Sequence, residues 1–154
     1  MQSEMVLSKV VPDLLRIRNR EDSDNFHNEW INNFIQNIKR NNGQICSYGQ
    51  AQKAINVFLK VFVYWSQRPD RGTANRITPF LHVPLDKILM NWMKERCHDE
   101  FKQRIKRYYA NKRFDCSLTL IGKEIYRSWQ KWFLDIHLNK PIMLDVIWAV
   151  NRFK

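Results

Sequence analysis

The sequence predicts an all-α protein, a compact single-domain bundle of about six or seven helices around one central buried helix. Apolar residues recur at helical spacing in most segments, and 44% of the 154 residues are hydrophobic, which is enough to bury a core. The chain has only 4 Gly and 5 Pro, too few for the many turns of a β-sandwich. It contains no internal repeat, low-complexity segment or linker, so residues 1–154 are expected to form one domain.

Two helices are expected at the start of the chain. Pro12 interrupts the pattern of the first, or sits in the first turn of a second short helix instead. Ser23 or Asp24 is expected to cap the next helix, and Asn41-Asn42-Gly43 to stop it. The apolar face of the first consists of Val6, Leu7, Val10, Val11, Leu14 and Leu15, and that of the next of Phe26, Trp30, Ile31, Phe34, Ile35 and Ile38.

The central helix is predicted from Tyr48 to Gln67. Its polar residues fall on one narrow arc (Gln52, Lys53, Asn56 and Lys60), and apolar residues cover the rest, as expected of a helix surrounded by others. The stretch from Arg68 to Pro84 is then predicted to be irregular, because three prolines and a glycine break any helix there. Loops of this length often carry function, and this one holds Arg68, Arg71 and Arg76.

The second half of the chain is also predicted to be helical. Pro84 is expected to begin one helix, and a further helix is expected from about Asp99 to Asn111. Ser117 leads into the most amphipathic segment, whose apolar face is Leu118, Ile121, Ile125, Trp129, Trp132, Phe133 and Ile136. Asn139-Lys140-Pro141 separates it from a last helix with Met143, Leu144, Ile147 and Trp148.

The net charge is the feature that most constrains function. Lys and Arg number 26 against 15 Asp and Glu, a formal charge of +11, and such a field attracts phosphates. Three unpaired cysteines without a Cys-x-x-Cys motif favour reduced thiols in the cytoplasm and no zinc site. No apolar run is long enough for a membrane span or a secretory signal, and no phosphate-binding glycine motif occurs, so no cofactor is expected.

Two basic stripes indicate a surface for nucleic acid. The first follows Asp99 and consists of Lys102, Lys106 and Arg113, with Tyr108 and Tyr109 available for base stacking if exposed. The second consists of Lys123, Arg127 and Lys131, spaced i, i+4, i+8 opposite the apolar face of the next helix. Together with the arginines of the loop they predict contacts to the phosphate backbone of RNA or DNA, by a component of a larger complex. The predicted contacts are Arg68, Arg71, Arg76, Lys102, Lys106, Arg107, Arg113, Lys123, Arg127 and Lys131.

Other interpretations of the same charge stay open. The stripes can be solvated faces, or they can meet an acidic protein partner, in which case the protein is a non-enzymatic interaction module. An anionic membrane surface is disfavoured, because the apolar faces are needed for the core. A homodimer or protein–protein surface is expected if Trp129 and Trp132 are incompletely covered.

Two Arg-to-His spacings, Arg20 to His27 and Arg76 to His82, resemble the Arg-x4–6-His motif of the HEPN ribonucleases. That family consists of small all-helical domains, often bacterial toxins or defence effectors, in which the Arg and His act on RNA at a dimer interface. The resemblance implies a metal-independent ribonuclease that uses Arg76 and His82. Pro79 keeps this pair off one regular helix, and His27 falls on an apolar face, where it is interpreted as a packed core histidine.

The pair His98-Asp99 resembles that of the HD-type metal phosphohydrolases, another all-helical family. The resemblance implies a divalent metal held by this pair, with His82 as first ligand and Asp135 or Asp145 as last. The sequence lacks the further acidic or histidine residues usual at such a site, so no metal is predicted. Cys97, between a cationic Arg and a His, is expected to have a lowered pKa, but no partner set for a catalytic thiol is legible.

Overall fold

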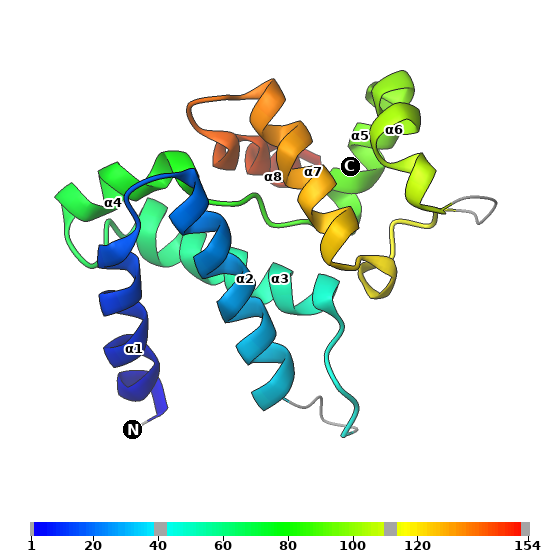
Figure 1. Ribbon diagram of the computed structural model, residues 1–154. Coiled ribbons are helices and arrows are strands. Elements are labelled where there is room, and N and C mark those ends of the chain that lie inside the picture. Colours follow the sequence, from blue (N-terminus) through cyan, green and yellow to red (C-terminus); the bar gives the residue numbers. More distant parts are fainter. Residues whose placement is uncertain (1, 39–42, 110–113, 152–154) are drawn as a thin grey trace.

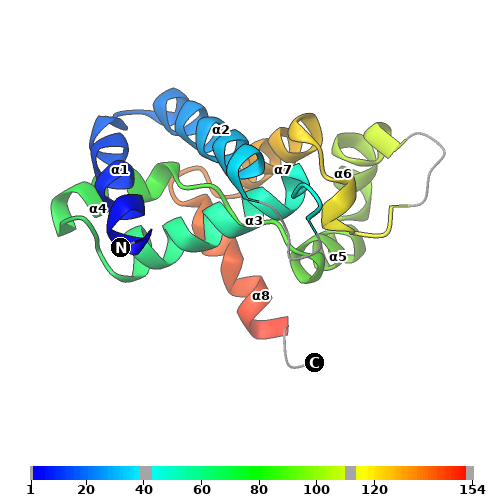
Figure 2. The same ribbon diagram turned by 90° about the horizontal axis from the view of Figure 1, so that it is seen from below.

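The computed structural model describes residues 2–38, 43–109 and 114–151 and confirms the all-α class (Figure 1). Within these ranges the chain forms helices joined by turns and extended segments, with no sheet. Figures 1 and 2 place α1 and α4 at one end of the molecule and α5 and α6 at the other, with α7 between them. None of the described helices is both long enough and apolar enough to cross a lipid bilayer.

The first two helices are α1 (Gln2–Arg16) and α2 (Arg20–Asn37). Pro12 lies inside α1 without ending it. The cap expected at Ser23 or Asp24 is wrong, because Asn19 caps α2 by accepting a hydrogen bond from the backbone N–H of Asp22. Ser23 instead lies one turn inside the helix, is buried, and donates its hydroxyl to the carbonyl of Phe80. The predicted stop lies partly outside the described residues, since Asn41 and Asn42 are not among them, and α2 ends before it at Asn37.

The central helix is α3 (Tyr48–Leu59), which continues as a π-helical segment (Lys60–Trp65). A capping box formed by Ser47 and Gln50 fixes its start. It packs against α2, α7 and the 3₁₀ turn Leu118–Leu120, so its central position is confirmed. Most of its polar arc is buried too, and these side chains form hydrogen bonds within the core; the exposed side of the π-helical segment carries Trp65.

The predicted irregular stretch is wrong in its middle. It contains α4 (Arg71–Ile77), followed by a 3₁₀ turn (Thr78–Phe80), before an extended, buried segment at residues 81–86. Asp70 caps α4 by accepting from the backbone N–H of Thr73, which compensates for the glycine in its first turn.

Two of the remaining helices begin later than predicted, whereas the one expected from about Asp99 begins at His98. Asp86, not Pro84, is the residue before α5 (Lys87–Arg96), and its carboxylate accepts from the backbone N–H of Leu89. Next come α6 (His98–Arg104) and a 3₁₀ turn (Lys106–Tyr109). The amphipathic segment splits into the turn Leu118–Leu120 and α7 (Lys123–Ile136). A 3₁₀ turn (Pro141–Asp145) leads to α8 (Val146–Asn151), which extends from the rest of the fold in Figure 2.

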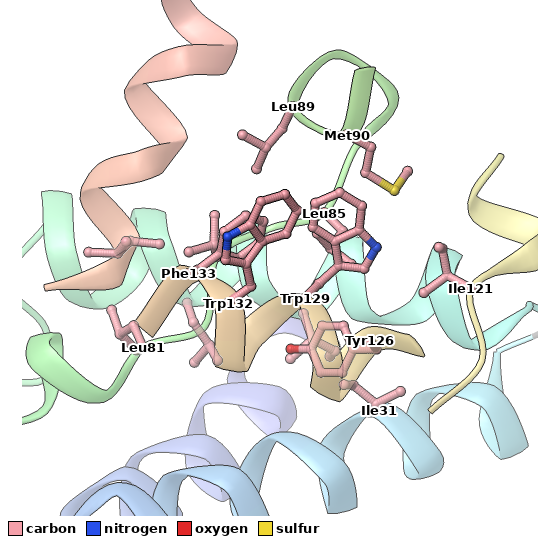
Figure 3. Close-up of a cluster of buried hydrophobic side chains, with 14 of the residues drawn as sticks. Ile31, Leu81, Leu85, Leu89, Met90, Ile121, Tyr126, Trp129, Trp132 and Phe133 are labelled. Carbon is pink, nitrogen blue, oxygen red and sulfur yellow. The ribbon is translucent and has the colours of Figure 1, made fainter. Parts of the chain in front are cut away.

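The apolar face of α7 is the middle of the core. Trp129 and Trp132 stack with ring centroids 5.3 Å apart, and both are buried, so they form no exposed docking surface. Figure 3 shows Leu89 and Met90 of α5 on one side of these rings and Tyr126 on the other, beside Ile31 of α2. Because this face is held inward by aromatic packing, the opposite face of α7 with its cations must point to solvent.

Candidate functional site

A pocket of about 400 Å³ opens between α2, α3, α7 and the extended segment at residues 81–86. Its inner part is built from buried groups of α7 and the extended segment, and its outer part from exposed charged side chains. The lining residues are Arg20, Asp24, Asn28, Tyr48, His82, Tyr126, Arg127, Gln130, Lys131 and Leu134.

A chain of hydrogen bonds runs from the core to this pocket. Asn56 Nδ2 lies 2.8 Å from Tyr126 Oη, which lies 2.6 Å from His82 Nδ1, and His82 Nε2 lies 2.7 Å from Asp24 Oδ1. An ionised carboxylate only accepts, so the neutral imidazole carries its proton on Nε2 and accepts at Nδ1 from the tyrosine hydroxyl. Every link is then a donor facing an acceptor, directed from Asn56 to Asp24.

His82 stacks on His27, with ring centroids 3.8 Å apart and an angle of 13° between the planes; these two residues are called the stacked histidines. Burial lowers the pKa of His82, against the opposing effect of Asp24. Burial and the neighbouring His82 lower the pKa of His27 well below its ordinary value. The lowered pKa values favour the neutral form of both rings at pH 7, and His27 Nδ1 donates to the carbonyl of Ser23 at 2.7 Å. The prediction that His27 is a packed core residue is therefore confirmed by its burial.

Arg20 joins α2 to the 3₁₀ turn before the extended segment. Its guanidinium donates to the carbonyls of Pro79 and Phe80 at 2.6 and 2.8 Å and stacks over the Phe80 ring at 5.6 Å. Two of its five N–H donors are used in this way, so others are free to meet a ligand in the pocket that Arg20 lines. The partial burial of Arg20 lowers its pKa, but an arginine remains charged at pH 7.

Two further cations lie at the same pocket. Arg127 and Lys131 are exposed side chains one turn apart on α7. Arg127 is near Tyr48, where its charge opposes the rise in the pKa of Tyr48 that burial causes. Asp24 is the acidic residue among those that line the pocket, and its side chain is 51% exposed. With neutral His82, three cations and one carboxylate leave the pocket with an excess of positive charge.

The polar side of α7, which carries Arg127 and Lys131, also contacts α6 and the 3₁₀ turn Lys106–Tyr109. Arg104 of α6 donates to Asp135, and the hydroxyls of Tyr108 and Ser128 lie 2.6 Å apart. The guanidinium of Arg107 stacks over the Tyr108 ring at 5.1 Å. These contacts hold Arg107 beside the polar side of α7.

Not all of the predicted contacts belong to this surface. Arg68, Arg71 and Arg76 are on or before α4, at the opposite end of the molecule from α6 (Figures 1 and 2). Lys102, Lys106 and Lys123 are exposed. Arg113 lies outside the described residues. The stacking expected of Tyr109 is not available, since only 6% of it is exposed.

The pair Arg76 and His82 is not joined by any hydrogen bond in the described structure. The guanidinium of Arg76 donates to the carbonyls of Leu15 and Ile17 and so holds the end of α1. Arg20, from the other Arg-to-His spacing, lines the pocket with His82 instead. Both ring nitrogens of His82 are hydrogen-bonded, so the ring is not free to take a proton from a substrate.

The residues considered for a metal are dispersed. His98 and Asp99 are exposed side chains, whereas Asp135 pairs with Arg104 and Asp145 with Lys60. No group of three or more His, Cys, Asp or Glu that could hold a metal occurs among the described residues. The expected lowering of the pKa of Cys97 is also wrong, because desolvation and then Glu100 raise it.

Several residues that line the pocket are not predicted from the sequence, among them Asp24, Asn28 and Tyr126. Asp24 was assigned only as a possible cap, and Asn28 and Tyr126 were not considered. A usable signal was present on α2, where Arg20, Asp24 and Asn28 repeat at i, i+4, i+8 and so share one face. Asp24 and His82 are 58 residues apart in the chain, and His82 and Tyr126 are 44 apart, so no local pattern indicates that these side chains meet.

Comparison with protein-family models, with curated proteins and with solved structures finds no match to this chain.

Proposed function

We propose that the protein binds nucleic acid through phosphate contacts on the surface around the pocket, with Arg20, Arg127 and Lys131 as its centre. The observation that supports this is the convergence of three cations from two helices far apart in the sequence. Arg127 and Lys131 repel each other by a few tenths of a kcal/mol as an i, i+4 pair of like charge. Asp135, the next residue of that row, already pairs with Arg104. A bound phosphate would supply a counter-charge for Arg127 and Lys131.

The positions of the cations favour backbone contacts over base reading at the surface. Arg127 and Lys131 are long, exposed side chains, and Arg107 lies beside the same polar side of α7. Such side chains position a phosphodiester strand without reading its sequence. The remaining predicted cations, Lys102, Lys106 and Lys123, are exposed and extend the positive field around this surface.

The test is a fluorescence-anisotropy titration with labelled single-stranded RNA, single-stranded DNA and duplex DNA at several salt concentrations. Arg127→Ala/Lys131→Ala is compared with Arg68→Ala/Arg71→Ala, which removes the same charge from the opposite end of the fold. The first variant is expected to weaken binding and to reduce the slope of log K against log salt by about 1.4–1.8, at roughly 0.7–0.9 per lost phosphate contact. The second is expected to keep the wild-type slope.

Three results would contradict the proposal. Equal loss in the two variants would assign binding to net charge alone. Loss only in Arg68→Ala/Arg71→Ala would move the binding surface to α4. No binding to any oligonucleotide at moderate salt would favour an acidic protein partner. Recovery of the RNA after each titration tests the ribonuclease alternative, since binding alone leaves the RNA intact.

A further inference from the structure

We infer that the pocket receives one base of a single strand and prefers guanine. This inference rests on the proposed function, because the strand is held at the pocket by the same cations. A pocket of about 400 Å³ is within the range of small-ligand sites, roughly 300–1,000 Å³. A base stacked in a duplex cannot enter it, so the occupant is an unpaired nucleotide whose phosphates stay on Arg127 and Lys131.

The walls of the pocket suit an aromatic ring. Tyr48, Tyr126 and Leu134 supply its apolar surface, and the Tyr48 and Tyr126 rings lie 5.6 Å apart at 60°. Stacking of a base on an aromatic side chain contributes to binding for every base and does not select among them. The choice of base must therefore come from the polar groups that line the pocket.

Most of those polar groups are already paired. Tyr126 and His82 are part of the hydrogen-bond chain, and Gln130 exchanges two hydrogen bonds with the backbone of Val83. Two acceptors remain on α2, and the Tyr48 hydroxyl and the Asn28 amide nitrogen are further lining groups that can donate. Asp24 uses Oδ1 for His82 and has Oδ2 available, and Asn28 Oδ1 is buried with no hydrogen-bond partner in the described structure. They are one turn apart on α2, so they lie side by side.

Two adjacent acceptors match a base with two adjacent donors. Guanine presents N1–H and the N2 amino group next to each other, and its O6 accepts from a cation such as Arg20 or Lys131. Uracil presents a single N–H between two carbonyl oxygens, so it can pair with one of the two acceptors and sets a carbonyl oxygen against the other. With uracil an acceptor of the pocket faces an acceptor of the base, and this juxtaposition disfavours uracil in addition to the missing hydrogen bond.

The test uses uridine oligomers of one length that carry a single guanosine, a single inosine or neither. They are made as RNA or as DNA, according to which single strand binds in the titration described above. Guanosine is expected to tighten binding about tenfold, in the range of discrimination of a two-hydrogen-bond contact to a base. The salt slope is expected to stay the same, since the number of phosphates is unchanged. Inosine lacks the N2 amino group and is expected to lose most of the gain.

Variants of α2 test the acceptors themselves. Asp24→Asn exchanges an acceptor for a donor, and Asn28→Ala removes the other acceptor. Both are expected to reduce the guanosine preference at least severalfold, whereas Asn32→Ala, an exposed position of the same helix, keeps it. The Tm of each variant shows whether it folds, and the inosine comparison tests the inference in the unaltered protein.

The outcomes separate this inference from the proposed function. Equal affinity for all three oligomers, with binding still lost in Arg127→Ala/Lys131→Ala, would overturn the base pocket and leave the phosphate surface standing. A guanosine preference that survives both Asp24→Asn and Asn28→Ala would also overturn it. Failure of the plain uridine oligomer to bind would refute the proposed function instead.

Discussion

Tyr126→Phe is the sharpest test of the hydrogen-bond chain, because it removes one oxygen and leaves the ring. The Tyr126 hydroxyl accepts from Asn56 and donates to His82, and all three side chains are buried. Without it, one N–H of Asn56 and the Nδ1 acceptor of His82 lose their partners in the core. Each such loss costs roughly 1–3 kcal/mol, so with two of them the variant is expected to be less stable by about 2–6 kcal/mol.

The assay is thermal unfolding followed by circular dichroism, with urea unfolding as a second probe. For a chain of this size 1 kcal/mol corresponds to a shift in Tm of roughly 2–4 °C, so Tm is expected to fall by about 4–24 °C. Tyr48→Phe is the matched control, because Tyr48 is only partly buried and its hydroxyl is not part of the chain. A Tm for Tyr126→Phe within about 2 °C of both the wild type and the control would refute the reasoning.

Three further predictions concern stability. Because burial lowers the pKa values of the stacked histidines, the stability of the fold is full above about pH 6.5, the ordinary pKa of histidine, and falls below that pH by up to about 2.7 kcal/mol per pH unit for the two groups. Tm is expected to decline between about pH 7.5 and pH 5.5, and to decline less in His27→Gln. An equal decline in that variant would contradict this account. Lys60→Met is expected to destabilise the protein by about 3 kcal/mol, because Asp145, which lies 2.6 Å from the Lys60 ammonium, loses its partner. In urea unfolding the double variant Lys60→Met/Asp145→Leu should regain most of the lost stability, and a failure to regain it would contradict this pairing. Gly49→Ala is expected to cost about 2 kcal/mol, because its Cβ would clash with the backbone oxygen of Leu118. Gly122→Ala meets open space and should change Tm little; equal Tm values for the two variants would contradict the clash and show that α3 can move away from that turn.

The helical architecture could be predicted because it depends on local information. Hydrophobic periodicity located α2, α3 and α7, and Trp129, Trp132 and Phe133 of the apolar face of α7 are buried as its pattern requires, although Ile136 at its end is exposed. The same periodicity placed Arg127 and Lys131 opposite that face, where they are exposed. Helix starts were less predictable, because several residues compete as caps; Asn19 precedes Ser23 and Asp24 and takes the role expected of them.

The stretch before Pro84 shows a limit of the local rules. Prolines and glycine there indicated a loop, but a helix forms because Asp70 caps it and because Thr73, Ala74 and Ile77 bury one side of it. Burial against the rest of the fold overrides a weak local propensity when the helix is short. The same packing directs Arg76 to the end of α1 and away from His82.

The sequence by itself determined the fold class, the most amphipathic helix and the excess of cations along its outer side. Only the tertiary structure decided which of those cations share a surface, and that His82 and Tyr126 form the floor of a pocket with Asp24 and Arg20 at its side. The physical reason is the range of each interaction. A periodic pattern reports which side of its own helix a residue occupies, whereas a hydrogen bond between residues 58 positions apart exists only after the helices have packed.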